Sequence, residues 1–208
     1  MRIYTKLLAL LIVALTFGIT TATASANRLS VSEEDAEMIW PEAEDINFAA
    51  GGNNVECSIT LLGSFHSRTI RKIANLLVAT VSHARIGDCD SGTAIIDAPP
   101  PWHVRYVGFT GTLPAISGVT IQLTGPRYTV SDPDTGGVCL TNAGVPAQSR
   151  INVGASGLVT SVTALSTPTI AIDDVGGSVI CDLAGIGAFT GVARFTDLDG
   201  NLVVITLI

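Results

Sequence analysis

The residues best suited to chemistry in this chain are four cysteines, Cys57, Cys89, Cys139 and Cys181. An even number of cysteines, in a chain that folds outside a reducing cytoplasm, predicts two disulfides. Zinc is the disfavoured alternative, because no Cys-x-x-Cys pair is present and the spacings are too long for a zinc knuckle. Three pairings are open. We prefer neighbours in sequence, Cys57 with Cys89 and Cys139 with Cys181, because each pair brackets a comparable segment.

The run Asp197-Leu-Asp199-Gly-Asn201 is the best candidate for a metal site. Its alternating oxygen-bearing side chains could wrap calcium, the one cofactor suggested, although the run lacks the sixth-place glycine and distal glutamate of an EF-hand. Further carboxylates could come from two other pairs, Asp132 with Asp134 or Asp173 with Asp174. A hairpin turn without a cofactor is favoured, because Asp, Gly and Asn tolerate the positive φ that such a turn requires.

Trp102 is the candidate for ligand contact. It follows a run of three prolines, which fixes an extended approach to the strand that begins there. The indole either fills the core at the start of that strand or presents a flat face to a sugar ring. Because aromatic residues make up only 5% of the chain, core filling is the favoured interpretation.

One basic cluster occurs in the chain, at Arg68, Arg71 and Lys72. A solvated strand edge that discourages pairing with other sheets is the favoured interpretation. The alternatives are a site that grips an acidic polysaccharide and a contact with the chain's own acidic segment.

The three histidines, His66, His83 and His103, show no spacing typical of a metal site or a catalytic motif. His66 and Asp97 could meet a serine in space, but no Gly-x-Ser-x-Gly elbow is present. We therefore predict that the chain has no catalytic residues and is not an enzyme, with a secreted hydrolase as an alternative.

The N-terminus predicts the compartment in which these residues fold. Arg2 and Lys6 precede an apolar run that ends at Ile19, and small residues fill positions 22–26, which is the order of a secretory signal peptide. The run is shorter than the roughly 18 to 20 apolar residues of a membrane span. We expect residues 1–26 to be the signal peptide and the mature chain to have no transmembrane span. The predicted location is secreted, extracellular or at the cell surface, with the periplasm as an alternative.

Charge is unevenly distributed along the rest of the chain. The sequence has 11 basic and 18 acidic side chains, a net charge of −7, and cleavage would remove two of the basic ones. Nucleic acid is therefore not expected as a partner, because phosphate binding relies on clustered Lys and Arg. Seven acids crowd residues 33–45. We predict an acidic, flexible N-terminal arm over residues 27–49 and a single β-rich domain over residues 50–208.

Beyond residue 49, short β-branched runs alternate with turn signals, which predicts an all-β fold, an antiparallel β-sandwich or barrel stapled by disulfides. Residues 70–86 fit either a strand or one face of a helix. A weak sequence similarity between residues 78–82 and 159–163 favours the strand and suggests two related halves. The apolar residues 202–208 must be paired or covered, because an exposed strand of this composition would aggregate.

The stretch Pro101-Trp102-His-Val-Arg-Tyr106-Val-Gly-Phe109-Thr-Gly-Thr-Leu-Pro114 resembles small exported bacterial β proteins of unassigned function. These proteins share a leader, a cysteine, Thr- and Ser-rich strands, a second cysteine and then a Pro-Trp strand. The plan is similar to that of the PraB family, named as activators of alkane oxidation and associated with surface adhesion and biofilm. The resemblance covers roughly residues 57–181 and brings no catalytic residues with it. The acidic segment and residues 67–72 have no counterpart in it.

These features favour an exported, non-catalytic structural or adhesive protein of the bacterial cell surface or extracellular matrix. Its expected partners are other surface proteins, copies of itself or polysaccharide. A calcium-dependent carbohydrate-binding module is the first alternative, and it would use Asp197, Asp199, Asn201 and Trp102. A secreted hydrolase is the second alternative.

Overall fold

The computed structural model describes residues 28–41, 45–50, 53–90, 92–112, 115–132, 137–141, 146–165, 172–174 and 187–208. These residues form strands and no helix, so the predicted all-β class is confirmed. The strands are β1 Arg28–Val31, β2 Asp35–Trp40, β3 Ile46–Ala50, β4 Asn53–Phe65, β5 Thr69–Arg71, β6 Leu77–Cys89, β7 Thr93–Ala98, β8 Trp102–Thr112, β9 Ala115–Thr124, β10 Arg127–Asp132, β11 Gly137–Thr141, β12 Ala147–Val153, β13 Val159–Leu165, β14 Ile172–Asp174, β15 Gly187–Thr196 and β16 Ile205–Leu207. The predicted signal peptide lies outside the described residues.

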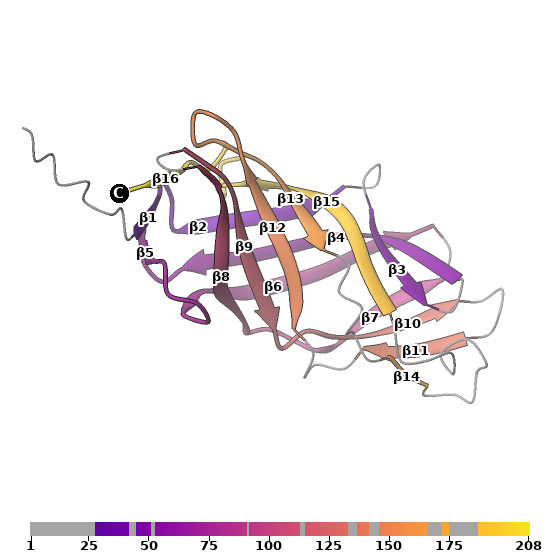
Figure 1. Cartoon of the computed structure of the whole chain (residues 1–208). Helices are drawn as coiled ribbons and strands as arrows, with labels where there is room; N and C mark the ends of the chain where they lie inside the picture. Colours follow the sequence, from indigo (N-terminus) through magenta and orange to yellow (C-terminus); the bar gives the residue numbers. More distant parts are fainter. Residues whose placement is uncertain are drawn as a thin grey trace, which may run out of the picture.

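The central element is an eight-stranded antiparallel barrel (Figure 1). Its strands follow the order β13-β12-β9-β8-β6-β4-β2-β15, and the pairing of β15 with β13 closes it. β3 continues the line of β2, since both pair with β4 on one side and β15 on the other. The prediction allowed a sandwich or a barrel, and the structure is a barrel.

Two smaller sheets lie at opposite ends of the barrel (Figure 1). One has the order β16-β1-β5, and the other has the order β14-β11-β10-β7. The first sheet contributes Leu29, Ile70 and Ile205 to the same buried cluster as the barrel residues, and the second contributes Tyr128 and Val130. One apolar core therefore joins all three sheets.

The N-terminal acidic segment is not a flexible arm, which corrects the prediction for residues 27–49. Residues 28–31, 35–40 and 46–50 form β1, β2 and β3, and each of these strands is paired. Leu29, Val31, Trp40 and Phe48 are buried in the core, whereas the acid Asp35 is exposed. Alternation in β2 places Ala36 and Trp40 inward, whereas Asp35 and Glu37 occupy the intervening positions, so these acids do not prevent the strand from forming. The domain therefore begins by residue 28 rather than at residue 50.

Residues 70–86 form strands, not a helix. β5 ends at Arg71, a turn with Asn75 at a φ of 65° follows, and β6 begins at Leu77. Val78 and Val81 are buried, and β6 pairs with β4 and β8. The β-branched residues of this run satisfy their backbone groups in the barrel, so the helical periodicity that the sequence also allows is not used.

The two similar segments, residues 78–82 and 159–163, lie in different parts of the barrel. Residues 78–82 belong to β6, between β4 and β8, and residues 159–163 belong to β13, between β12 and β15. The Ser-Arg dipeptide before the first copy lies in a connection, at Ser67, whereas the second lies within β12. A division into two related halves stays a prediction.

The last residues are paired, which agrees with the prediction that this apolar terminal run must be paired or covered. β16 pairs with β1, and the backbone of Val203 and Ile205 also bonds to Val159 and Gly157. Val203 and Ile205 are buried, while Leu202 is exposed. Strand alternation thus divides this run between the core and the surface.

Candidate functional site

The disulfide between Cys57 and Cys89 joins β4 to β6 at directly opposed positions. Cys57 is fully buried, and its sulfur bonds to that of Cys89 at 2.07 Å. This bond confirms the first predicted cysteine pair. Cys139 lies in β11, and its predicted partner Cys181 lies outside the described residues.

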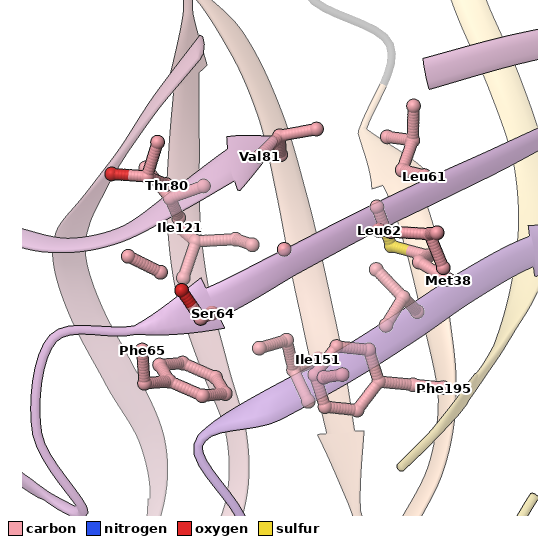
Figure 2. A pocket seen from close by; sticks show the side chains of 15 residues that line it. Met38, Leu61, Leu62, Ser64, Phe65, Thr80, Val81, Ile121, Ile151 and Phe195 are labelled. Carbon is pink, nitrogen blue, oxygen red and sulfur yellow. The ribbon is translucent and has the colours of Figure 1, made fainter. Parts of the chain in front are cut away.

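The barrel interior is apolar and holds two small adjoining cavities, of about 60 and 70 Å³. Both are lined by Met38, Leu61, Val81, Val104 and Ile121. Figure 2 shows side chains from β2, β4, β6, β9, β12 and β15 around the first of them. An eight-stranded barrel is about as wide as its own side chains can fill. The interior is therefore a packed core.

Trp102 belongs to this core, because only 1% of it is exposed. Its indole Nε1 donates a hydrogen bond of 2.8 Å to the Ala98 carbonyl oxygen, and its ring lies edge-on to Tyr128 with 5.8 Å between centroids. Burial raises the pKa of the Tyr128 phenol far above its usual range. The favoured core interpretation of Trp102 is correct. The alternative ligand role is wrong, because stacking on a sugar would need an exposed ring face.

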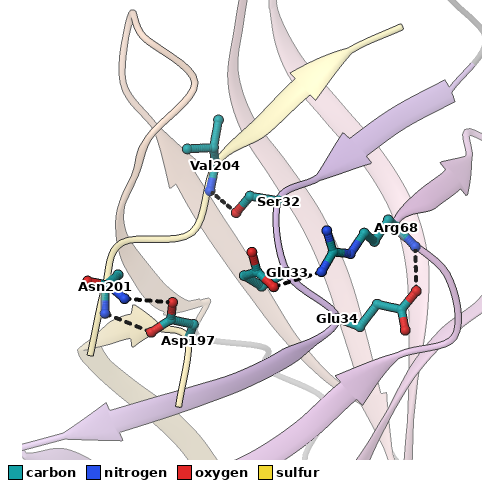
Figure 3. A network of polar contacts seen from close by, with 7 residues as sticks. All are labelled: Ser32, Glu33, Glu34, Arg68, Asp197, Asn201 and Val204. Atoms are coloured by element: carbon teal, nitrogen blue, oxygen red, sulfur yellow. Dashed lines mark hydrogen bonds and ion pairs between the residues drawn. The ribbon is translucent and has the colours of Figure 1, made fainter. Parts of the chain in front are cut away.

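The Asp197 to Asn201 run forms a turn that uses both carboxylate oxygens of Asp197 internally (Figure 3). Oδ1 accepts the backbone N–H groups of Asp199 and Asn201 at 2.9 and 2.7 Å, and Oδ2 accepts the Asn201 amide at 3.0 Å. Bonds to Asn201 are the main reason that the pKa of Asp197 is lowered. Gly200 has a φ of 83°, and Thr196 and Leu202 bridge across the base of the turn. These are the features of the favoured hairpin.

The additional carboxylates considered for calcium lie elsewhere. Asp132 is in β10, and Asp173 and Asp174 are in β14, both in the four-stranded sheet. Asp134 lies outside the described residues. Within the described part of the chain, no group of three or more His, Cys, Asp or Glu side chains is arranged to hold a metal. Calcium binding at Asp197, Asp199 and Asn201 stays a proposal, and it would compete with the bonds of the turn.

We expect Asp197→Ala to lower the melting temperature at pH 7, because the turn loses its internal acceptor. A carboxylate whose folded pKa lies below its unfolded pKa stabilises the protein above the unfolded value, and this contribution is lost as the pH falls through the folded value. The difference between wild type and variant should therefore narrow towards pH 3. Melting curves by circular dichroism measure it. A shift above about 1 °C on adding millimolar calcium to the wild type would instead show a bound ion.

Arg68 contacts the chain's own acidic segment, which was one of the three interpretations of the basic cluster (Figure 3). Its guanidinium lies 2.9 Å from a Glu33 carboxylate oxygen, and its backbone N–H donates to Glu34 at 3.2 Å. Both side chains of the ion pair are largely exposed, so the pair contributes little stability. Arg71 and Lys72 face a different environment, because they line an open groove beside β8.

Within the part of the chain that the structure describes, no observed contact joins a histidine to a carboxylate. His66 lies just after β4 with its Nε2 2.8 Å from the Thr80 hydroxyl, whereas His83 and His103 are exposed on β6 and β8. Asp97, in β7, accepts a 2.6 Å hydrogen bond from Thr129. Among the described residues, no histidine contact supports the hydrolase alternative.

β7 lies at the edge of its sheet within the described residues, which the sequence did not predict. β7 pairs with β10 on one side, and its other side has no strand partner within the described residues. The Ala98 carbonyl, at the end of the strand, accepts the hydrogen bond from Trp102. Ile95 is 60% exposed, and Asp97 is the only charged residue of the strand. An unpaired edge with an exposed β-branched residue is a template for another strand.

No family model, no curated protein and no solved structure matches this chain. The resemblance to exported β proteins and to the PraB family stays a prediction. Among the described residues, no helix has both the length and the apolar character needed to cross a membrane.

Proposed function

We propose that this chain is an exported, non-catalytic structural or adhesive protein of the bacterial cell surface or extracellular matrix, and that it assembles with copies of itself through β7. The observation that carries the proposal is the edge of β7, which has no strand partner within the described residues, together with its exposed Ile95. The Cys57–Cys89 disulfide supports the export half, because such bonds persist in oxidising compartments.

The residues of β7 favour antiparallel pairing with a second copy. In a two-fold arrangement centred on Ile95, the two Ile95 side chains oppose each other and Thr93 opposes Asp97 of the second copy. Opposed β-branched residues and a hydroxyl beside a carboxylate are favourable cross-strand pairs. Pairing would also remove Ile95 from water and satisfy the exposed backbone groups of the edge.

The test is the oligomeric state of the oxidised mature protein by sedimentation velocity over a range of concentrations. We expect multimers for the wild type and a shift towards monomer for Ile95→Lys, because a lysine on the edge opposes a second lysine across the two-fold axis. The matched control is Leu198→Lys, which places the same charge at a residue that is 59% exposed but lies in a turn.

A wild-type protein that stays monomeric and binds neither cells nor hydrophobic surfaces contradicts the proposal. Equal loss of multimers in the Ile95→Lys and Leu198→Lys variants contradicts the assignment to β7. The carbohydrate-module and hydrolase alternatives gain no specific support, since Trp102 is buried and Asp197 bonds within its own turn.

A further inference from the structure

An open groove of about 720 Å³ lies where the end sheet meets β8. β1, β5 and β8 surround this part of the molecule in Figure 1. Its lining includes the cations Arg28, Arg71 and Lys72, and the apolar residues Ile73 and Phe109. None of the described residues that line it is acidic. The groove thus gathers three positive side chains on a chain whose net charge is −7.

Arg28 and Arg71 are directly opposed cross-strand partners in the β1–β5 pair. Both are exposed, and the one ion pair found among the described residues is Arg68 with Glu33, not a pair of this groove. Like charges at opposed positions of an antiparallel pair destabilise it. A pair of arginines in this position is favourable once an anion lies between them, because the guanidinium fork binds carboxylates bidentately.

Lys72 and the apolar wall complete the groove. The Lys72 Nζ lies 4.9 Å from the centre of the Phe109 ring, which holds the ammonium group over β8 while leaving its charge in place. Ile73 is 54% exposed on the same surface. Cations beside an apolar wall match a ligand that carries both carboxylates and the apolar faces of sugar rings.

We infer that this groove binds an acidic polysaccharide whose charges are carboxylates. The inference rests on the proposed function, which places the protein at a cell surface or in a matrix where such polymers occur. It names an acidic polysaccharide as the partner of the protein there. The net negative charge of the protein repels a polyanion at long range, so attraction comes from the local cations and is strongly screened by salt. An open groove, unlike an enclosed pocket, lets a polymer pass through it.

The test is binding of polygalacturonate to the oxidised mature protein by isothermal titration calorimetry, at low and high salt. We expect binding that weakens at high salt, and at least a tenfold loss of affinity in the double variant Arg28→Gln/Arg71→Gln. The matched control is Arg85→Gln/Arg127→Gln, which removes the same charge from two exposed arginines outside the groove. Neutral dextran should not bind.

A thermal melt of the double variant shows whether a loss of binding is caused by misfolding. Relief of the opposed arginines should leave the melting temperature of Arg28→Gln/Arg71→Gln equal to or above that of the wild type. No binding of polygalacturonate by the wild type, an equal loss in the control variant, or tighter binding of dextran sulfate overturns the inference. If the protein multimerises but does not bind polygalacturonate, the result contradicts this inference and leaves the proposed assembly intact. If the protein binds polygalacturonate but stays monomeric, the result contradicts the proposed assembly and leaves this inference intact.

Discussion

Replacing Cys57 and Cys89 with alanine should lower the free energy of unfolding by roughly 3 to 4 kcal/mol, the value expected when a disulfide closes a loop of this size. The two cysteines are 32 residues apart, and they link β4 to β6 at the end of their shared pairing. Urea unfolding of the oxidised wild type and the double variant measures the difference. A loss below about 1 kcal/mol would show that the barrel does not depend on this bond.

The same variant provides a way to detect the second predicted disulfide. A reducing agent should destabilise the wild type strongly. If Cys139 and Cys181 are also bonded, the reducing agent should still lower the stability of the variant that lacks Cys57 and Cys89. A variant that is insensitive to reduction would contradict the predicted Cys139–Cys181 pair.

Trp102→Ala should lower the free energy of unfolding by about 3 to 5 kcal/mol, because it leaves a large cavity in the core. The indole is almost fully buried, it contacts the Tyr128 ring, and it donates the hydrogen bond that satisfies the Ala98 carbonyl. Chemical denaturation is again the measurement.

Ile95→Ala is the control for this loss, since Ile95 is a large apolar residue of a nearby strand that lies mostly in solvent. In the monomer, Ile95→Ala should lower the free energy of unfolding by no more than about 0.5 kcal/mol. If Trp102→Ala cost no more than Ile95→Ala, Trp102 would not be the core residue that its burial indicates.

The all-β class and the 197–201 turn could be predicted from the sequence, because alternating β-branched residues and an Asp-Gly-Asn run reflect the chemistry of a few neighbouring residues. The first disulfide could be predicted from the even cysteine count and from a preference for cysteines that are neighbours in sequence. The structure bears out these three. It also selects the strand for residues 70–86, where local periodicity fits two structures equally well.

The N-terminal segment was misjudged because its composition and its pattern conflict. Its acids suggest a solvated arm, whereas Leu29 and Val31, then Ala36, Met38 and Trp40, recur at every second position as in a strand. Period-two alternation decides which side chains reach the core, and charge density does not.

The edge of β7 and the opposition of Arg28 to Arg71 could not be predicted from the sequence, although Arg71 and Lys72 stand out there as part of a basic cluster. Both features depend on long-range pairing: within the described residues β7 pairs with β10 alone, and Arg28 meets Arg71 because β1 pairs with β5. Sequence identifies a strand but not its neighbours, so an unpaired edge or an opposed pair of cations appears only in the folded chain.

The central claim is that the mature chain works at the cell surface as an assembled, non-catalytic component. Fractionation of an intact culture of the native organism, with a blot for the mature chain in the medium, the washed surface and the boiled detergent pellet, tests it most directly. We expect surface-bound multimers that resist detergent and that diminish in a strain carrying Ile95→Lys but not in one carrying Leu198→Lys. Recovery of the wild-type chain as a soluble monomer in the medium would contradict it.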